Sequence, residues 1–250
     1  MRILIVGYGS MGREVEKALL PLGHFVAGRI DISGTGDDTE LTPDWLDKCD
    51  GVIEFALGDS VIENMGIYAR SGKPVVMGTT GWQDRLDEAR RIVGENNASF
   101  LYGSNFSIGA HLFFMLAEKA SSLVDNLPEY DFMLHEYHHK NKKDSPSGTA
   151  LTAAKRVLSA SSRKDTIVTQ ALDRRIEPNE LHVSSTRGGS IPGTHTFTLD
   201  SDADTIVIQH SARSRGGFAL GAVRALEWLT GKTGFFTAED FITDMLGGKI

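Results

Sequence analysis

The first hundred residues repeat one rhythm, in which short apolar runs alternate with segments of helical character. The runs occupy residues 3–6, 25–30, 52–56, 75–77 and 99–102. Near-continuous apolar strands are buried on both faces, as in a parallel sheet that crossover helices cover on both sides. The sequence therefore predicts a Rossmann-like doubly wound parallel α/β domain in this part of the chain.

From about Asn105 the pattern changes. Apolar residues at helical spacing begin at Leu112, and strand-like segments follow near residues 131–137, 166–172, 181–186, 194–199 and 205–210. Such a row of strands predicts a smaller α+β domain with an open mixed sheet. Helical patterning returns after Arg215 and continues through residues 241–246.

Composition limits the classes of protein to which this chain can belong. With 40% hydrophobic and 24% charged residues among 250, it suits a folded globular protein. The single cysteine, Cys49, excludes an internal disulfide and favours a reducing compartment. We find no signal-peptide pattern and no apolar run of membrane-spanning length, so we expect a cytoplasmic protein without a membrane partner. A net charge of -7 argues against a nucleic-acid partner, because phosphate binding needs a broad basic face.

A glycine-rich turn, Gly7-Tyr8-Gly9-Ser10-Met11-Gly12, stands between the first apolar run and a helical segment. In this context G-x-G-x-x-G is typical of a dinucleotide site: the glycines let the backbone approach the pyrophosphate, and the helix N-terminus faces the phosphates. Asp31 follows nineteen residues after Gly12, where a carboxylate can accept the ribose hydroxyls. Its charge favours NADH, whereas Arg29 leaves NADPH open as the alternative.

Two further turns follow the fourth and fifth apolar runs. They are Gly78-Thr79-Thr80-Gly81 and Gly103-Ser104-Asn105-Phe106. The carboxyl ends of parallel strands meet at one edge of the sheet, where open α/β folds bind their ligands. Either sequence is also ordinary turn chemistry. Their shared position at one edge favours contact with a cofactor or substrate.

Residues 138–149 concentrate five basic side chains in an acidic chain. Apolar residues at helical spacing follow, so Ser147, Gly148 and Thr149 stand where a helix begins. The first amides of a helix lack partners and lie at the positive end of its dipole, which favours a carboxylate or phosphate. The alternative is a solvated basic loop before a capped helix. Two adjacent histidines and Lys142 favour the anion site.

The chain resembles the dihydrodipicolinate reductase family, also called 4-hydroxy-tetrahydrodipicolinate reductases. Residues 136–150 match the family signature E-x-H-H-x-x-K-x-D-x-P-S-G-T-A. The glycine motif, the Gly-Thr-Thr-Gly turn, the Ser-Asn-Phe-Ser-Ile-Gly sequence and residues 214–219 extend the likeness along essentially the whole chain. Many members carry a longer G-x-x-G-R-M-G loop than residues 7–12 here, so the resemblance leaves open the choice between NADH and NADPH.

The resemblance implies an oxidoreductase in which NAD(P)H gives a hydride to 4-hydroxy-tetrahydrodipicolinate, a cyclic dicarboxylate, and forms tetrahydrodipicolinate on the diaminopimelate route to lysine. By position in the signature, His138 is the proton donor and Lys142 its catalytic companion. A histidine titrates near neutral pH, and an ammonium group offsets charge that builds during transfer. The substrate-binding residues implied are His139, Gly148, Thr149 and Arg215.

The same resemblance implies which residues bind the cofactor and how the domains divide. The cofactor residues are Gly7, Tyr8, Gly9, Ser10, Met11, Gly12, Asp31, Gly78, Thr79, Thr80, Ser104, Asn105 and Phe106. Residues 1–106 and 216–250 form the dinucleotide-binding domain, and residues 107–215 the substrate-binding and oligomerisation domain. A homotetramer joined through the second-domain sheets is implied as well. No metal is expected, because His135, His138 and His139 lack the spacing of a zinc site.

Two other functions are compatible with parts of the sequence. A different nicotinamide oxidoreductase with a catalytic lysine explains the glycine loop, but not the pairing of His-His-x-x-Lys with Pro-Ser-Gly-Thr. A redox-sensing Rossmann module needs neither a proton donor nor a basic dicarboxylate pocket. The sequence leaves open whether the ring is reduced in its hydroxylated or dehydrated form, and whether feedback regulates the reaction.

Overall fold

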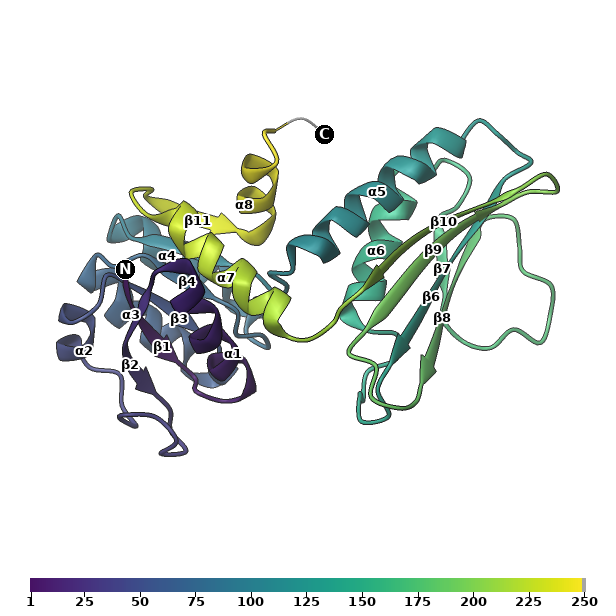
Figure 1. Cartoon of the computed structure of the whole chain (residues 1–250). Helices are drawn as coiled ribbons and strands as arrows, with labels where there is room; N and C mark the ends of the chain where they lie inside the picture. The colour runs from purple at the N-terminus through teal and green to yellow at the C-terminus, as the bar shows by residue number, and fades with distance from the viewer. Residues whose placement is uncertain (249–250) are drawn as a thin grey trace. The chain divides into compact units, whose positions relative to one another are not determined.

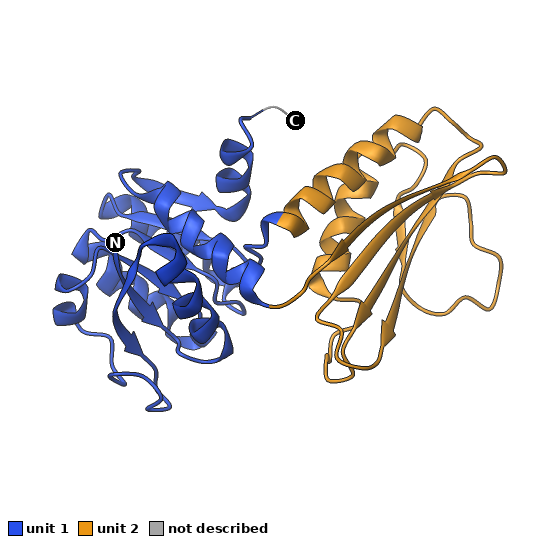
Figure 2. Cartoon of the chain, viewed as in Figure 1, with its two compact units in different colours: residues 1–108, 215–250 blue, residues 109–214 orange. Residues whose placement is uncertain are grey.

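The first and last parts of the chain fold together in the computed structural model, which describes residues 1–248. Unit 1 comprises Met1–Ile108 and Arg215–Ile250, and unit 2 comprises Gly109–Ser214 (Figure 2). Lys249 and Ile250, which end the predicted first domain, lie outside the described residues.

Unit 1 is built on a parallel sheet of six strands in the order β11-β5-β4-β3-β1-β2 (Figure 1). The strands are β1 (Arg2–Val6), β2 (Phe25–Ile30), β3 (Gly51–Glu54), β4 (Val75–Met77), β5 (Ser99–Tyr102) and β11 (Gly234–Thr237). Every residue of β3 and β4 is buried, because helices cover both faces. The predicted Rossmann-like sheet is confirmed.

Helices follow the strands of unit 1, as the alternating rhythm predicts. They are α1 (Ser10–Leu19), α2 (Pro43–Asp47), α3 (Val61–Ser71), α4 (Leu86–Glu95), α7 (Gly216–Leu229) and α8 (Ala238–Met245), with 3-10 turns at Leu20–Leu22, Gly58–Ser60 and Gln83–Arg85. The sequence did not predict β11, which completes the sheet by pairing Phe235 with Phe100 of β5. The strand was missed because it contains only two apolar residues and because its pairing joins segments that are far apart in the chain.

Unit 2 combines a mixed sheet of five strands with two helices. The strand order is β10-β9-β6-β8-β7, with β6 (Asp131–His138), β7 (Thr166–Val168), β8 (Glu180–Arg187), β9 (Thr194–Asp200) and β10 (Thr205–Ser211). β8 pairs in parallel with β6 and β7, whereas β9 pairs antiparallel with β6 and β10. The predicted open mixed sheet is confirmed, although the strand expected over residues 166–172 ends at Val168.

Helices α5 (Ile108–Val124) and α6 (Gly148–Ser159) pack on one face of the second sheet (Figure 1). Along β6, the buried residues Phe132 and Leu134 face these helices, and they alternate with the exposed residues Met133 and Tyr137. Within residues 1–248, no helix combines the length and the apolar composition that a bilayer crossing needs.

Helix α7 approaches the turn after β5 through a glycine. A Cβ atom on Gly221 would lie 1.7 Å from the carbonyl oxygen of Phe106, so the helix and the turn touch backbone to backbone. Gly217 of the same helix has room, because the atom nearest to its would-be Cβ is the Ser107 hydroxyl oxygen at 3.9 Å. The two glycines therefore differ in packing but share one helix.

We expect Gly221→Ala to lower the free energy of unfolding by about 1 to 3 kcal/mol, the usual cost of overpacking. In an open helical position the same change gains up to about 1 kcal/mol. Gly217→Ala is the matched control and should be neutral or stabilising. Urea unfolding followed by circular dichroism measures both variants, and equal stability of the two would contradict the close approach.

Candidate functional site

Unit 1 has a cavity of about 720 Å³ at the carboxyl ends of β1, β2 and β3. Because β1 lies between β2 and β3, the strand order reverses here, and open α/β sheets bind ligands at such a point. Three of the predicted cofactor residues, Gly7, Gly9 and Asp31, line the cavity. Its apolar lining includes Val6, Ile30, Ile32, Leu41, Phe55, Ala56, Leu57 and Ile67.

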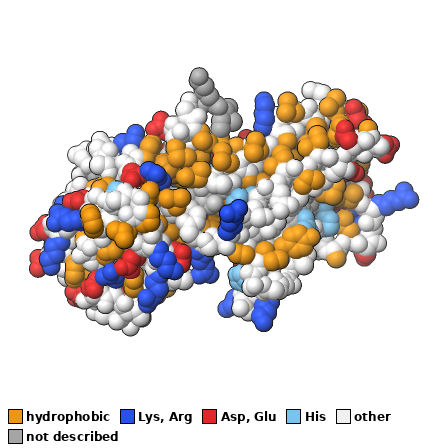
Figure 3. Space-filling model, in the orientation of Figure 1, with side chains coloured by type: hydrophobic (Ala, Val, Ile, Leu, Met, Phe, Trp, Pro, Cys, Tyr) orange, Lys and Arg blue, Asp and Glu red, His pale blue; other side chains and the backbone are white. Residues whose placement is uncertain are grey.

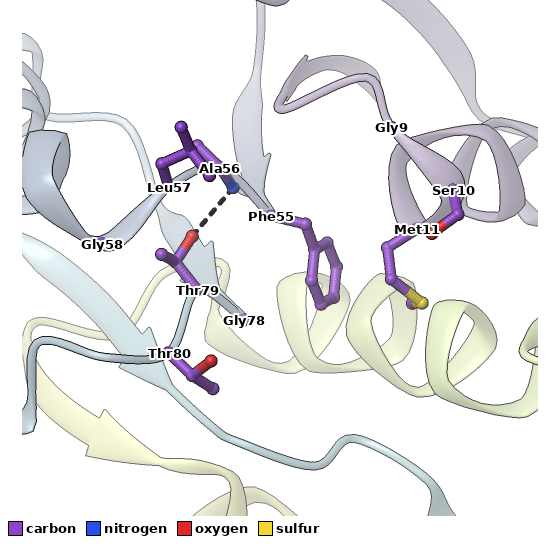
Figure 4. Close-up of a pocket in the computed structure, with 10 residues that line it drawn as sticks. All are labelled: Gly9, Ser10, Met11, Phe55, Ala56, Leu57, Gly58, Gly78, Thr79 and Thr80. Carbon is purple, nitrogen blue, oxygen red and sulfur yellow. Dashed lines mark hydrogen bonds between the residues drawn. The ribbon is translucent and has the colours of Figure 1, made fainter. Parts of the chain in front are cut away.

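A second cavity, of about 380 Å³, opens at the N-terminus of α1 (Figure 4). Its lining brings together three turns at one sheet edge: residues 9–11 after β1, residues 55–58 after β3 and residues 78–80 after β4. The hydroxyl oxygen of Thr79 accepts a hydrogen bond from the Ala56 amide at 2.9 Å, which joins two of these turns (Figure 4). The amides at a helix start favour an anion in this cavity.

Asp31 connects the end of β2 to the glycine turn. Its carboxylate accepts hydrogen bonds from the Tyr8 amide at 2.6 Å and from the Ser33 amide at 2.9 Å. The side-chain hydrogen bond from Ser33 is the main cause that lowers the pKa of Asp31, and it outweighs the effect of burial. A charged carboxylate therefore stands in the wall of the larger cavity.

Arg29, the residue that left NADPH open, is already paired. Its guanidinium donates to Glu16 and, at 3.0 Å, to Asp37. It lies over the Tyr8 ring at 5.5 Å, and Arg13 lies over the same ring at 4.6 Å. Two carboxylates thus match the positive charge of Arg29.

Five predicted cofactor residues lie outside the two cavity linings: Tyr8, Gly12, Ser104, Asn105 and Phe106. Some of them have a clear packing role. A Cβ atom on Gly12 would lie 2.3 Å from the Gly7 carbonyl oxygen, so this glycine lets α1 begin close to the turn. Phe106 is 1% exposed and meets Phe55 edge to face, with ring centroids 6.3 Å apart.

Sequence reasoning missed the turn after β3, residues 55–58. Its residues Phe55, Ala56 and Leu57 line both cavities. The sequence did contain a usable signal. Ligands bind at the edge where the carboxyl ends of parallel strands meet, and this argument, made for the turns after β4 and β5, applies equally to the turn after β3. The acidic residues Glu40, Asp59 and Glu63 in the lining of the larger cavity were also missed.

In unit 2, the buried carboxylate of Glu136 on β6 is the centre of a polar cluster. Its Oε1 atom accepts hydrogen bonds from the Ser147 amide at 2.8 Å, the Ser185 hydroxyl at 2.9 Å and the Arg187 guanidinium at 2.7 Å. Its Oε2 atom accepts from the Ser147 hydroxyl and lies 3.3 Å from Nε2 of His195. Burial raises the pKa of Glu136, but these hydrogen bonds, led by the one from His195, outweigh burial and hold the pKa well below its usual range.

His138 is 7% exposed and belongs to the same cluster. Its Nδ1 atom lies 3.1 Å from the Pro192 carbonyl oxygen, and because a carbonyl only accepts, Nδ1 carries a hydrogen. Its Nε2 atom lies 3.3 Å from Oε2 of Glu136. Burial lowers the pKa of His138, while the carboxylate of Glu136 opposes that shift.

The signature segment forms the start of α6, as the sequence predicts. The Ser147 hydroxyl caps the helix by accepting from the Ala150 amide at 3.1 Å. Just before the helix, Lys142 forms an ion pair of 2.8 Å with Asp144. Burial raises the pKa of Asp144, but Lys142 and, more weakly, the Gly148 amide lower it below its usual value. A carboxylate thus already rests between Lys142 and the helix N-terminus.

The predicted substrate residues fall in both units. His139, Gly148 and Thr149 lie in unit 2 beside the Glu136 cluster, as does the predicted catalytic residue Lys142, and Arg215 is an exposed residue of unit 1 at the start of α7. The His139 amide donates to the Ile191 carbonyl at 2.8 Å. Its Nδ1 atom is buried and has no hydrogen-bond partner among the described residues.

Glu136, His138 and His195 place one potential metal ligand each within 4.8 Å of one another. The carboxylate already accepts several hydrogen bonds, one of them from the cationic Arg187 at 2.7 Å. A metal cation there would meet a guanidinium charge at the same oxygen pair. The guanidinium charge of Arg187 therefore disfavours a metal cation at this cluster.

Sequence reasoning missed Arg187 and His195. They stand on β8 and β9, 51 and 59 residues after Glu136, and reach it only through strand pairing. One local signal was Gly193, between them: a Cβ atom there would lie 2.7 Å from the ring of His138. That glycine lets the β8–β9 loop close over the histidine.

Comparison with known proteins finds relatives along nearly the whole chain. The family models described as dihydrodipicolinate reductase, N-terminus and C-terminus, match residues 1–106 and 109–242. A 4-hydroxy-tetrahydrodipicolinate reductase of Christiangramia forsetii is 39% identical over 246 residues, 98% of this chain and 99% of the relative. That of Archaeoglobus fulgidus is 34% identical, covering 97% and 100%. A solved dipicolinate-bound dihydrodipicolinate reductase from Paenisporosarcina sp. TG-14 is 19% identical, with a TM-score of 0.76 over 95% of this chain and 97% of that one.

The fold and the relatives together define an oxidoreductase with a nicotinamide cofactor. More specifically, the chain belongs to the dihydrodipicolinate reductase family. The family that residues 136–150 indicated is therefore confirmed, and so is the class of enzyme. The solved structure shows the shared fold.

A buried carboxyl group lies next to the larger cavity. Glu54, at the end of β3, is 0% exposed and accepts hydrogen bonds from the Tyr68 hydroxyl and, at 3.3 Å, from Asn64, which lines the cavity. Its Oε1 atom has no hydrogen-bond partner among the described residues. Burial raises the pKa of Glu54 from 4.5 to about 7.

This shift predicts an unusual pH dependence of stability. Between pH 4.5 and about 7 the folded protein keeps a proton on Glu54 that the unfolded chain has lost, so stability falls as pH rises. The loss is about 3 kcal/mol, and Glu54→Gln should flatten this slope and stabilise the protein at pH 8. Denaturant unfolding at several pH values measures it, with the exposed Glu63→Gln as control. An unchanged slope in Glu54→Gln would show that the carboxyl titrates normally.

Proposed function

We propose that this protein reduces 4-hydroxy-tetrahydrodipicolinate, or its dehydrated form, to tetrahydrodipicolinate with a hydride from NADH. Unit 1 binds the dinucleotide and unit 2 binds the cyclic dicarboxylate. One observation carries the proposal: the family signature forms a helix N-terminus with Lys142 and the buried His138 beside it. Family membership supports the reaction.

The residues of unit 1 fit a dinucleotide. Gly7 has φ +86°, and a Cβ atom on it would lie 2.3 Å from the Phe55 carbonyl oxygen, so this glycine lets the turn after β1 pack directly against the turn after β3. Residues 9–11 would hold the pyrophosphate at the start of α1. Asp31 would accept the ribose hydroxyls in the larger cavity. The bound cofactor supplies the hydride.

NADH suits the larger cavity better than NADPH. The lining carries the acidic residues Asp31, Glu40, Asp59 and Glu63, and it includes no lysine or arginine among the described residues. A 2′-phosphate would add negative charge beside these carboxylates, and like charges at short range are costly. Arg29, paired with Glu16 and Asp37, offers no unmatched positive charge.

The N-terminus of α6 would bind one substrate carboxylate. That place already holds the carboxylate of Asp144 between Lys142 and the Gly148 amide, so its chemistry suits such a group. His139 and Thr149 would add contacts, and Arg215 would serve the second carboxylate. Hydride addition to the dehydrated ring pushes an electron pair onto the ring, so a proton must follow, and His138 would donate it. The hydroxylated ring would first lose its hydroxyl group as water.

The sheet of unit 2 has an open face, and we propose that it joins four protomers. Strand register places Val207, Thr198 and Met133 in one row on the face opposite α5 and α6. Val207 is 55% exposed, Met133 40% and Tyr137 42%. Figure 3 shows that hydrophobic side chains form several patches on the visible side of the molecule. Burying such a face favours association.

The cofactor proposal predicts a preference at Asp31. NADH should give at least as high a kcat/KM as NADPH with the cyclic substrate, and Asp31→Ala should shift the ratio toward NADPH by about tenfold, which corresponds to about 1.4 kcal/mol. Asp47→Ala removes an equal charge from an exposed site on α2 and should leave the ratio unchanged. Absorbance of the reduced nicotinamide measures all rates. A strong NADPH preference that survives Asp31→Ala would exclude the ribose contact.

The catalytic proposal predicts coupled losses at His138 and Lys142. His138→Gln should lower kcat by about 10² to 10⁴ with an unchanged Kd for NADH, because it removes a general acid and lies outside unit 1. Lys142→Ala should lower kcat and raise the substrate KM. The double variant should lose less than the product of both effects. Lys143→Ala, an exposed neighbour, is the control, and full additivity would mean independent roles.

A further inference from the structure

Glu136 contacts both parts of unit 2 that the proposed function uses. Its two carboxylate oxygens bind the amide and the hydroxyl of Ser147, which caps the helix proposed to hold the substrate. The same carboxylate lies 3.3 Å from His138, two residues further along β6 and on the same face of the sheet. One buried group therefore fixes the distance between the proposed proton donor and the substrate helix.

We infer that Glu136 is a positioning residue for the reduction, and that together with Arg187 it sets the protonation of His138 and anchors the start of α6. This inference rests on the proposed role of His138 as proton donor. Glu136 itself is 0% exposed and enclosed by its hydrogen-bond partners, so it acts through His138 and Ser147.

The charges around His138 oppose one another. Burial has the largest effect and disfavours the protonated imidazole, Glu136 favours it, and His195, Lys142 and Arg187, in that order, disfavour it. His139 also faces this ring, with centroids 6.5 Å apart, and the Lys142 charge is shared with Asp144. Glu136 is thus the carboxylate in direct contact with His138, and Arg187 is the cation that offsets it.

A purely structural role would not require this charge. A neutral glutamine oxygen can accept a hydrogen bond from Ser147, and burying an ionised carboxylate is costly unless its partners stabilise it. The partners at Glu136 are themselves held in place. The ring of His195 packs near Phe113 and stacks near His210, with centroids 6.3 and 6.4 Å away. Arg187 also donates to the Asp144 carbonyl at 2.6 Å, in the segment between Lys142 and α6.

The test is the titration of His138, read in two ways on the full-length enzyme. Imidazole ¹⁵N NMR gives the inflection directly, and kcat against pH gives the limb where the rate falls as His138 loses its proton. Glu136→Gln should move both to lower pH, and Arg187→Gln should move both to higher pH, each by about 1 pH unit. At a fixed pH above the inflection, kcat of Glu136→Gln should fall about tenfold.

Three further variants complete the design. Ser185→Ala removes a hydrogen bond from Glu136 without changing charge, so its inflection should stay in place. Arg187→Lys keeps the charge and should restore the wild-type inflection. His138→Gln should abolish the fall of kcat with rising pH, and this result would assign that part of the pH profile to His138. If Glu136→Gln fails to fold, the contrast between Arg187→Gln and Arg187→Lys decides the question.

Shifts of opposite sign in Glu136→Gln and Arg187→Gln support the inference. Shifts of equal sign, or a fixed inflection in both, overturn it. If the NMR inflection moves as expected while the kcat profile stays fixed, Glu136 still sets the protonation of His138. In that case the proton-donor role of His138 in the proposed function is wrong. The two readouts therefore separate the inference from the proposal on which it rests.

Discussion

The first amide hydrogens of an α-helix have no partners inside the helix, and both proposed sites depend on that property of the backbone. In unit 1 the chain enters α1 through a glycine turn, and the start of the helix faces a cavity. In unit 2 it enters α6 through Ser147, whose amide and hydroxyl are held by Glu136. Each unit places a strand and a helix start side by side. The neighbouring side chains then decide which anion suits the place: carboxylates surround the larger cavity of unit 1, whereas Lys142 stands before α6.

Three carboxyl groups show how surroundings decide charge. Asp31 is kept ionised by the Ser33 and Tyr8 hydrogen bonds. Glu54 has few donors and no cation among the causes of its shift, so burial dominates and its pKa rises to about 7. Glu136 likewise has no exposed surface, yet a guanidinium, a histidine and a serine outweigh burial and keep it charged. Burial alone therefore does not predict the charge of a carboxyl group; its donors do.

The relatives show which properties of the protein depend on the fold and which depend on particular side chains. A structure with 19% identity still superposes with a TM-score of 0.76, so widely different side chains build the same two units. Relatives at 34–39% identity over nearly the whole chain share the family. A fold alone hosts many functions. The proposed reaction is thus argued from the geometry around residues 136–149 and from family membership.

The sequence by itself determined features that depend on neighbours along the chain. Apolar runs fixed five strands of the first sheet, the spacing after Thr149 fixed α6, and the signature fixed the family. Tertiary structure decided what depends on pairing across the chain. Strand β11 joins β5 across about 130 residues, and Arg187 and His195 reach Glu136 through strands β8 and β9. The turn after β3 becomes a cavity wall only when β1 lies beside it. Local periodicity reports which face of an element is buried, but not which distant residue it meets, because that choice depends on sheet order and register.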